Sequence, residues 1–303
     1  TMRSASRLCS RTVAVGWVAM ALLQSLPGRE GEIKASVPAQ MRGPIARQGL
    51  PPHVEPERAP QAAAAEEGGA SPAAAAVLAC DRVQDWLLEE CNDYRGMRVR
   101  RPLACGEMQR QVDLLALYEA LGQDEAVGEA VRVAQLASSE GDVAAEWAAA
   151  ARRLVRQVGS PGLPEDLSLQ IQRDIEEVGV VMAKLLPNAE DIKLKLELMG
   201  ENSCSRWHQD SYTCRAIITY NGWGTVYTEH DNVDFWELKN CGNNDCILRD
   251  SSQVWSAECG DVLLMKGKLF PSPANGLVHK SPERRYQSDG NIMNRLCLKF
   301  DVA

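Results

Sequence analysis

The chain is poor in aromatic residues and in long apolar runs, and each shortage excludes a class of protein. Phe, Trp and Tyr together make up 5% of the 303 residues. No apolar stretch approaches the roughly 18 residues that a bilayer-spanning helix needs, so we expect no stable transmembrane segment. Ten cysteines in 303 residues also fall well below the roughly 8–10% that is typical of a disulfide scaffold.

Basic residues are outnumbered as well. The 33 Lys and Arg face 41 Asp and Glu, which gives a formal net charge of −8. A duplex-binding protein needs a basic surface for the phosphate backbone, so this balance excludes nucleic acid as the main partner. The charge is uneven, because residues 1–60 carry eight basic and four acidic side chains. That segment is therefore +4, and the rest of the chain is −12.

The first 35 residues have the composition of a targeting segment. Arg3, Arg7 and Arg11 precede an apolar stretch at 13–23, and no acidic residue occurs before Glu30. This pattern favours a plastid or mitochondrial transit peptide, with a secretory or lumenal signal as the alternative. Residues 36–76 are rich in Pro and Ala and read as a disordered linker, which leaves its His53 without a role.

A helical segment and then a β-rich domain are expected downstream. Residues 77–187 are predicted to be helical, with helices at 125–137, 142–157 and 165–186 from alanine content or apolar spacing. Residues 188–303 read as short strands separated by Gly, Asn and Asp turns. The expected strands are 192–198, 214–220, 225–228, 247–249, 262–265 and 296–300. We predict an α+β protein whose domain is a double-stranded β-helix, a jelly-roll or cupin-like barrel.

The clearest chemical motif is Trp207-His208-Gln209-Asp210. On a strand, His208 and Asp210 would project from the same face. The next histidine with strand-like surroundings, His279, follows 71 residues later. Two histidines and one carboxylate form the facial triad of non-haem Fe(II) oxygenases, and the same ligands also bind Zn²⁺. We therefore expect a mononuclear metal site, with iron favoured and zinc as the alternative.

The motifs around this triad resemble known families. Their order, from H-x-D through a glycine turn to a second histidine and a basic strand, is similar to that of double-stranded β-helix oxygenases. Five motifs at 207–210, 215–225, 260–267, 276–282 and 295–301 more closely resemble the domain of unknown function 1826 family. The first resemblance implies 2-oxoglutarate as a possible cofactor, with a basic residue on a late strand holding its far carboxylate. The second implies the β-helix architecture and leaves the substrate open.

Several side chains are candidates for binding the cofactor or the substrate. Arg295 is the main candidate for the 2-oxoglutarate carboxylate because guanidinium offers a two-pronged hydrogen bond, although an ordinary ion pair is an equal alternative. The other candidates for the cofactor are Thr219, Tyr220 and Lys299, and the candidates for a substrate pocket are Trp207, Arg215, Trp223 and Lys266. Strand formation accounts equally for Thr219 and Tyr220, and core packing accounts for the tryptophans.

The remaining His and Cys residues are assigned ordinary roles. His230 precedes Asp231 in a polar stretch and is expected at the surface. Cys241 and Cys246 have the spacing of a zinc half-site, but a second Cys or His pair is missing. A local disulfide is the alternative, and scattered thiols are the main expectation.

Together these features predict a metal-binding β-helix protein that resembles an Fe(II)/2-oxoglutarate-dependent oxygenase and acts on an unknown small molecule or protein. The alternatives are a non-catalytic metal-binding module, for which zinc is the other ion that suits the ligands, and a degenerate barrel with a structural role. A structural barrel would gain no stability from added metal, whereas a metal site would.

Overall fold

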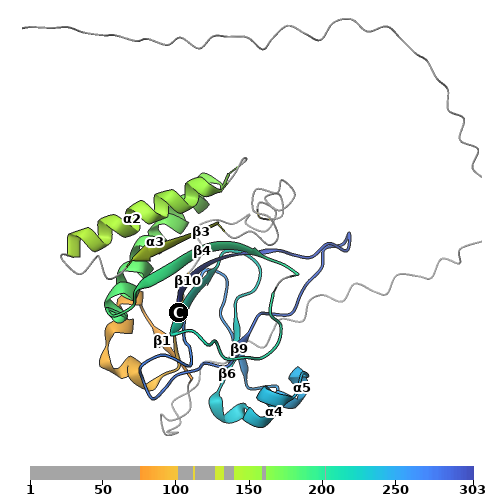
Figure 1. Ribbon diagram of the computed structural model, residues 1–303. Helices are drawn as coiled ribbons and strands as arrows, with labels where there is room; N and C mark the ends of the chain where they lie inside the picture. The colour runs from red at the N-terminus through yellow and green to blue at the C-terminus, as the bar shows by residue number, and fades with distance from the viewer. Residues whose placement is uncertain (1–75, 102–111, 113–126, 133–139, 159–161, 202) are drawn as a thin grey trace, which may run out of the picture. The chain divides into compact units, whose positions relative to one another are not determined.

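Two β-sheets and two long helices make up most of the computed structural model. It describes residues 76–101, 112, 127–132, 140–158, 162–201 and 203–303, all within one unit, Glu67–Ala303. The predicted targeting segment and nearly all of the predicted linker lie outside the described residues. The architecture is mixed α+β, as expected (Figure 1).

The larger sheet has seven strands in the order β1-β2-β8-β5-β10-β4-β3. β1 and β2 are parallel, and every other neighbouring pair is antiparallel. In sheet order the strands are Val77–Cys80, Gly96–Val99, Val262–Lys266, Cys214–Thr219, Arg295–Val302, Asp191–Met199 and Val127–Arg132.

The smaller sheet has three strands in the order β7-β6-β9. They are β7 Val254–Ser256, β6 Val226–Thr228 and β9 His279–Lys280, and both pairings are antiparallel. An isolated antiparallel bridge joins His208 to His279, on β9. The smaller sheet therefore places the two histidines of the predicted triad next to each other.

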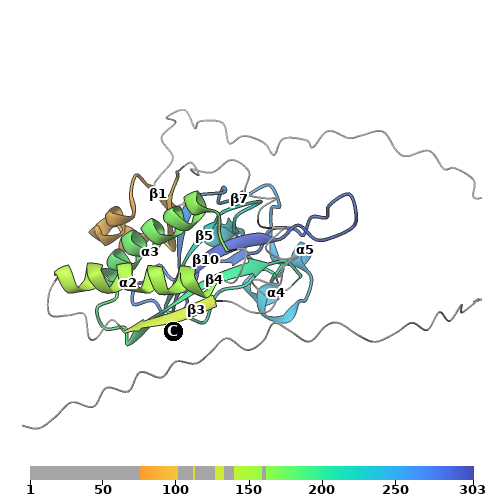
Figure 2. The same cartoon turned by 90° about the horizontal axis from the view of Figure 1, so that it is seen from above.

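Helices α2, Glu140–Gln157, and α3, Glu165–Leu185, lie against the larger sheet on the same side, as Figures 1 and 2 show. α3 presents apolar residues at helical spacing, and Trp147 of α2 meets Phe300 of β10 with ring centroids 6.0 Å apart. The alternate residues of β10 on this side are apolar and fully buried: Leu296, Leu298 and Phe300. Burial of these apolar faces is the main force that holds the helices on the sheet.

The opposite face of β10 is mostly polar, although its Cys297 packs with Ile217 and Leu263 in a second apolar cluster. Arg295, Cys297, Lys299 and Asp301 alternate with the apolar residues of β10, as the two-residue period of a strand requires. Arg215 of β5 is the register partner of Asp301. The sequence prediction that Arg295, Cys297 and Lys299 share one face is confirmed, and this polar face leads to the candidate site.

The expected helical segment at 77–187 needs correction. It contains strands β1, β2 and β3 and the short 3-10 helices η1, Val83–Leu87, and η2, Glu89–Asp93. The helix expected at 125–137 is wrong in its centre, because Val127–Arg132 pairs along β4. Backbone hydrogen bonds to an existing sheet edge here outweigh the helix propensity of alanine.

The segment expected as a strand at 247–249 is not one, because Ile247 ends a helix and Leu248 forms only an isolated bridge with Val233. α5, Asn244–Ile247, follows α4, Phe235–Asn240, and both begin at a residue whose side chain caps the helix, Asn243 and Asp234. None of the helices in the described part of the chain combines the length and apolar character that crossing a membrane requires.

Candidate metal centre

Two segments far apart in sequence meet at His208, Asp210 and His279. His208 and Asp210 lie in the connection between β4 and β5, and His279 begins β9. The backbone N–H of each histidine donates to the carbonyl of the other, both at 3.0 Å. Gln209 Nε2 also donates to the carbonyl of Gly276 at 2.5 Å. These bonds fix the two segments side by side before any ligand is considered.

The three side chains converge at ligand distance. His208 Nε2 lies 3.7 Å from Asp210 Oδ1, and His279 Nε2 lies 3.7 Å from Asp210 Oδ2. One ligand atom from each residue lies within 4.8 Å of the others. Ligands that surround one ion at about 2.0–2.2 Å must themselves be roughly 3 to 4 Å apart. The arrangement therefore fits a single metal ion with small side-chain adjustments.

Hydrogen bonds to backbone carbonyls orient both imidazoles. His208 Nδ1 lies 2.7 Å from the carbonyl of Arg206, and His279 Nδ1 lies 3.0 Å from that of Leu277. A carbonyl only accepts, so each Nδ1 carries the hydrogen and each Nε2 keeps its lone pair. A neutral imidazole held through one nitrogen and free at the other is the form that binds metals.

Burial keeps His279 neutral. Its side chain is 5% exposed, and burial together with the nearby His208 lowers its pKa to about 4, against the opposing charge of Asp210. His279 is thus uncharged at physiological pH and ready to bind a cation. His208 is more open, with 31% of its side chain exposed.

Asp210 belongs to a small network of charged side chains. Its neighbour Arg215 reaches Asp210 Oδ2 at 3.2 Å and also Asp301 Oδ1 at 2.5 Å. Burial lowers the Arg215 pKa, but the hydrogen bond and charges of Asp301 and the charge of Asp210 outweigh it and raise that pKa. Lys195 Nζ lies 3.8 Å from Asp301 Oδ2, so Asp301 has a second cation and Asp210 has Arg215 as its ion-pair partner. Asp210 Oδ2 is buried and, although ion-paired with Arg215, accepts no hydrogen bond from the described residues, so it keeps a lone pair for a metal ion.

Trp207 and His208 border a cavity of about 800 Å³. Trp207 is 3% exposed, so it packs in the wall while His208 faces the opening. His230, which was expected at the surface, lines the same cavity and begins the short 3-10 helix η4, His230–Asn232. No sequence pattern pointed to that placement, because it depends on a contact between two distant segments.

Arg295 and Trp223 lie elsewhere. Arg295 is 6% exposed, and its Nη1 donates to the carbonyl of Trp223 at 2.9 Å. Both residues line a separate space of about 10 Å³ that none of the triad residues borders. The guanidinium of Arg285 covers the Trp223 ring at 3.7 Å. The structure thus does not bring Arg295 or Trp223 into the cavity that contains His208.

Three of the other predicted binding residues have structural partners. The Tyr220 hydroxyl donates to Asp174 Oδ2 at 2.6 Å on the helix side of the sheet, and Lys299 pairs with Glu197. Lys266 donates to the carbonyl of Cys91 at 2.7 Å and likewise lies on the helix side. The expectation that Tyr220 and Lys266 face the site is therefore corrected by strand alternation. Thr219 does lie on the polar face, 3.6 Å from Cys297 Sγ.

Comparison with known proteins identifies the family. Residues 123–301 match the family described as protein of unknown function, DUF1826, which is more than half of the chain. The chain belongs to the DUF1826 family. The crystal structure of a full-length Neurospora crassa protein in complex with alpha-KG is similar at a TM-score of 0.33 and 7% identity, over 75% of this chain and 84% of that chain. A likeness this weak carries no argument about fold or ligand. No curated protein matches the sequence.

A second group of possible ligands occurs in this DUF1826 protein at α4 and α5. Glu237, Cys241 and Cys246 each offer a ligand atom within 4.8 Å of the others. The backbone N–H of Asn243 donates to Cys241 Sγ at 3.3 Å. The sequence pointed to Cys241 and Cys246 but missed Glu237, which lies on the same helical turn as Cys241. The cysteines of the described residues are free thiols.

Proposed function

We propose that His208, Asp210 and His279 bind one Fe(II) ion and that this DUF1826 protein is a non-haem Fe(II)/2-oxoglutarate-dependent oxygenase. The observation that carries the proposal is the meeting of two Nε2 atoms with the two oxygens of one carboxylate, each pair 3.7 Å apart. Three protein ligands on one side of a metal leave positions for a co-substrate and O₂. With these bound, the metal supplies the oxidation of a C–H bond of the substrate.

The sheet topology supports a double-stranded β-helix as the scaffold. Along the chain, the backbone crosses repeatedly between the two sheets. β4, β5, β8 and β10 belong to the larger sheet, and the segments between them, namely His208, the pair β6 and β7, and β9, belong to the smaller one. The resulting orders, β8-β5-β10-β4 and β7-β6-β9 followed by His208, match the winding of a jelly roll. In this arrangement the smaller sheet positions both metal-binding histidines.

The chain's own groups have distinct roles in this proposal. The carbonyls of Arg206 and Leu277 keep the hydrogens of His208 and His279 on Nδ1, so that Nε2 faces the metal. Arg215 holds the Asp210 carboxylate between the two imidazoles while Asp301 offsets its charge. Removing such supporting groups typically weakens metal binding by about 10–100-fold.

Arg295 is the proposed anchor for the far carboxylate of 2-oxoglutarate. Its Nη2 is buried without a hydrogen-bond partner among the described residues, and no carboxylate of the described chain pairs with it. A buried guanidinium in this state favours an anionic ligand, which it can bind through two parallel hydrogen bonds. Lys299 is less suited because Glu197 already neutralises it.

The decisive experiment is anaerobic titration of the metal-free protein with Fe(II) and then 2-oxoglutarate. We expect a weak visible charge-transfer band that needs both additions and is absent from the His279→Ala variant. Admission of O₂ should consume 2-oxoglutarate and release succinate. Stoichiometric iron binding with neither the band nor turnover of 2-oxoglutarate would exclude the oxygenase.

The second candidate is a non-catalytic metal-binding module, for which zinc is the suitable ion. The observation in its favour is that Arg295 and His208 line different cavities. It predicts that the purified protein retains one zinc ion through His208, Asp210 and His279 and gives no response to 2-oxoglutarate. Metal analysis of the wild type and the His208→Ala variant distinguishes this module from a metal-free structural barrel, whose melting temperature would not change on adding metal.

A further inference from the structure

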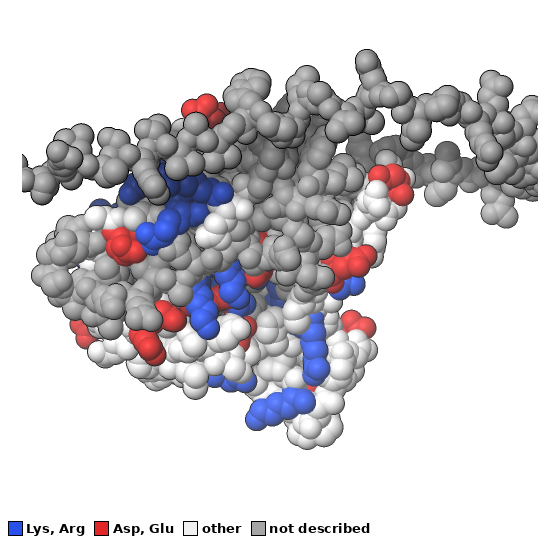
Figure 3. Space-filling model, turned by 45° about the horizontal axis from the view of Figure 1, so that its top comes forward, with Lys and Arg blue, Asp and Glu red and all other residues white. Residues whose placement is uncertain are grey.

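The cavity beside His208 has an unusual charge. Four cationic side chains, Arg95, Arg206, Lys239 and Lys268, line its space of about 800 Å³. None of its lining residues is Asp or Glu, although the whole chain has a net charge of −8. On the face that Figure 3 shows, basic and acidic side chains of the described residues are intermixed. The lining of one sign is therefore a local property of this cavity.

These four cations also lack ion-pair partners in the described part of the chain. Arg206 donates to the carbonyls of Cys241 and Leu238 at 2.7 and 3.3 Å, and Arg95 donates to the carbonyl of Asn275 at 2.5 Å. Carbonyls orient a guanidinium without neutralising it. The acids near Arg95, Asp231 and Glu229, oppose the lowering of its pKa by burial, but neither lies within 4.0 Å. Arg206, Lys239 and Lys268 are exposed and Arg95 is partly buried, so water and backbone carbonyls, not acidic side chains, solvate these four charges.

The rest of the wall combines one histidine with apolar side chains. His230 Nδ1 is buried and has no hydrogen-bond partner among the described residues. Its ring lies 4.3 Å from the ring of Phe235 between centroids, and Phe235 and Leu238 supply an apolar part of the lining. A set of cations and an apolar wall around one cavity together describe a ligand with an acidic end and an apolar body.

We propose that this cavity binds a small organic anion, with its phosphate or carboxylate held by Arg95, Arg206, Lys239 and Lys268, and that this anion is the substrate class of the metal site. The assignment to the metal site rests on the proposed function, because His208 connects the cavity to the triad. Binding of the anion does not, because the cations act without the metal. A cavity lined by one sign of charge concentrates ions of the opposite sign, by about 10-fold or more. The substrate anion is distinct from 2-oxoglutarate, for which Arg295 is the proposed anchor.

The test uses pyridoxal 5′-phosphate on the metal-free full chain, with pyridoxal as the matched probe that lacks the phosphate. Either aldehyde forms an imine with a lysine amine and releases water, and borohydride then reduces the imine to a stable secondary amine. We expect Lys239 and Lys268 to be labelled about 10-fold faster by the phosphate probe than Lys193, an exposed lysine of β4. Pyridoxal should label all three at similar rates. Peptide mapping by mass spectrometry measures each rate.

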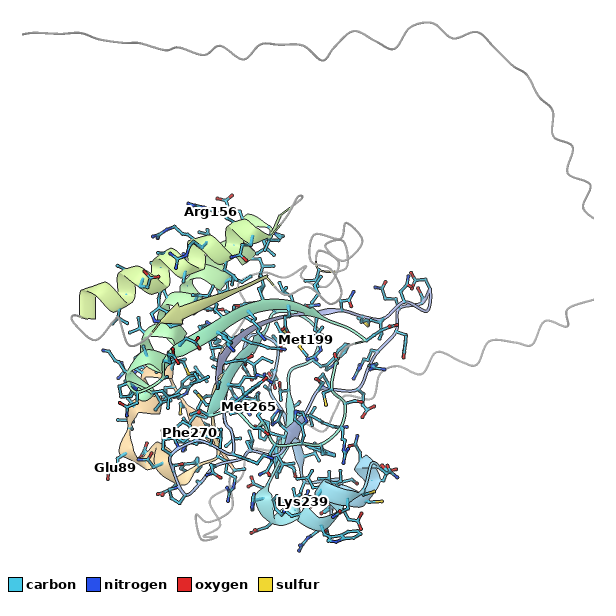
Figure 4. All side chains as sticks on the ribbon, in the orientation of Figure 1. Glu89, Arg156, Met199, Lys239, Met265 and Phe270 are labelled. Atoms are coloured by element: carbon cyan, nitrogen blue, oxygen red, sulfur yellow. The ribbon has the colours of Figure 1, made fainter. Side chains whose placement is uncertain are left out.

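Two further measurements make the outcome decisive. Arg206→Gln should reduce the preference at least 3-fold, whereas Arg156→Gln should not, since exposed Arg156 and Lys239 lie at opposite sides of Figure 4. In the wild type, 0.5 M salt should also reduce the preference by screening the cations, which keeps the test valid if Arg206→Gln does not fold. Equal labelling of all three lysines by pyridoxal 5′-phosphate would overturn the proposal.

Competition identifies the anion and separates this proposal from the proposed function. Protection of Lys239 and Lys268 by pyrophosphate but not by citrate indicates a phosphate ligand, and the reverse indicates a carboxylate. Protection by 2-oxoglutarate alone would show that the cations hold the co-substrate and would overturn the assignment of a second anion. Since no metal is present, failure of the iron titration leaves these results unaffected.

Discussion

His208 and His279 are joined through their backbones, each N–H donating to the carbonyl of the other at 3.0 Å. Residues that exchange both hydrogen bonds in an antiparallel pair lie directly opposite each other with side chains on one face. This accounts for the 4.4 Å between the two ring centroids. The candidate metal centre is therefore built on strand pairing, and Asp210 needs only to follow His208 by two residues to complete it.

Loss of one histidine should remove most metal affinity. His279→Ala deletes a buried ligand that no neighbouring side chain can replace, so we expect Co²⁺ affinity to fall by more than about 100-fold, beyond the cost of losing a supporting group. Competition titration with a chromophoric chelator measures the change. The matched control is His230→Ala, which removes a histidine of the adjoining cavity and should change the affinity by less than about 3-fold. Equal losses in both variants would contradict the assignment of ligands.

A substitution that touches no ligand should also disturb the site. A Cβ on Gly267 would lie 1.8 Å from the carbonyl oxygen of Tyr212 and 3.3 Å from that of Asp210. Gly267→Ala must therefore push away the backbone that carries Asp210. We expect a loss of about 1–3 kcal/mol in the free energy of unfolding, and metal binding weakened at least 10-fold. Gly242→Ala is the matched control, because no atom lies within 4 Å of its new Cβ. Chemical denaturation and metal titration should show that this variant keeps the wild-type stability and metal affinity.

The sequence predicted the parts of the fold that depend on local periodicity. The expected helices at 142–157 and 165–186 agree with α2 and α3 to within two residues at each end. The alternation of Leu296, Leu298 and Phe300 with charged residues gave the correct faces of β10. These features are visible in the sequence because burial on one side imposes a fixed period on helices and strands.

The sequence failed where tertiary contacts decide the structure. β3 lies in a run suited to a helix and becomes a strand by pairing with β4. The roles of Tyr220 and Lys266 were misjudged because both lie on the helix side of the sheet, where Asp174 and the carbonyl of Cys91 bind them. His208, Asp210 and His279 were correctly expected to lie together, since strand alternation and motif order both pointed to it. Metal binding itself stays a prediction.

Tyr220 provides a test of its structural role. Tyr220→Phe removes the hydroxyl that donates to Asp174 Oδ2, while Arg101 still binds that carboxylate through two nitrogens at 2.5 and 2.6 Å. Since the charge stays paired, we expect only about 1–2 kcal/mol of lost stability. Affinity for Fe(II) and 2-oxoglutarate should remain within about 2-fold. A selective loss of 2-oxoglutarate binding at unchanged stability would instead mean that Tyr220 contacts the co-substrate.

Lys266 should make stability depend on pH in the alkaline range. Its side chain is 2% exposed, and burial lowers its pKa to about 8 against the opposing charges of Cys91 and Asp93, from 10.5 in the unfolded chain. Between these two values the unfolded state binds more protons than the folded state, so stability rises with pH. One pKa unit corresponds to 1.36 kcal/mol, so the difference between the two pKa values limits the gain in folding stability to about 3 kcal/mol. Residual contact with water lowers this limit, and we expect a gain of roughly 1–3 kcal/mol.

The measurement is urea unfolding from pH 7 to 10.5 in the wild type and in Lys266→Met. Methionine has a similar length and no charge, so the variant should lack the rise attributable to Lys266. As pH increases, the wild type should therefore gain about 1–3 kcal/mol of stability relative to Lys266→Met. Lys193→Met removes an exposed lysine of β4 and should leave the wild-type pH dependence intact. Parallel curves for the wild type and Lys266→Met would mean that Lys266 is solvated, because only a buried ammonium favours losing its proton within this range.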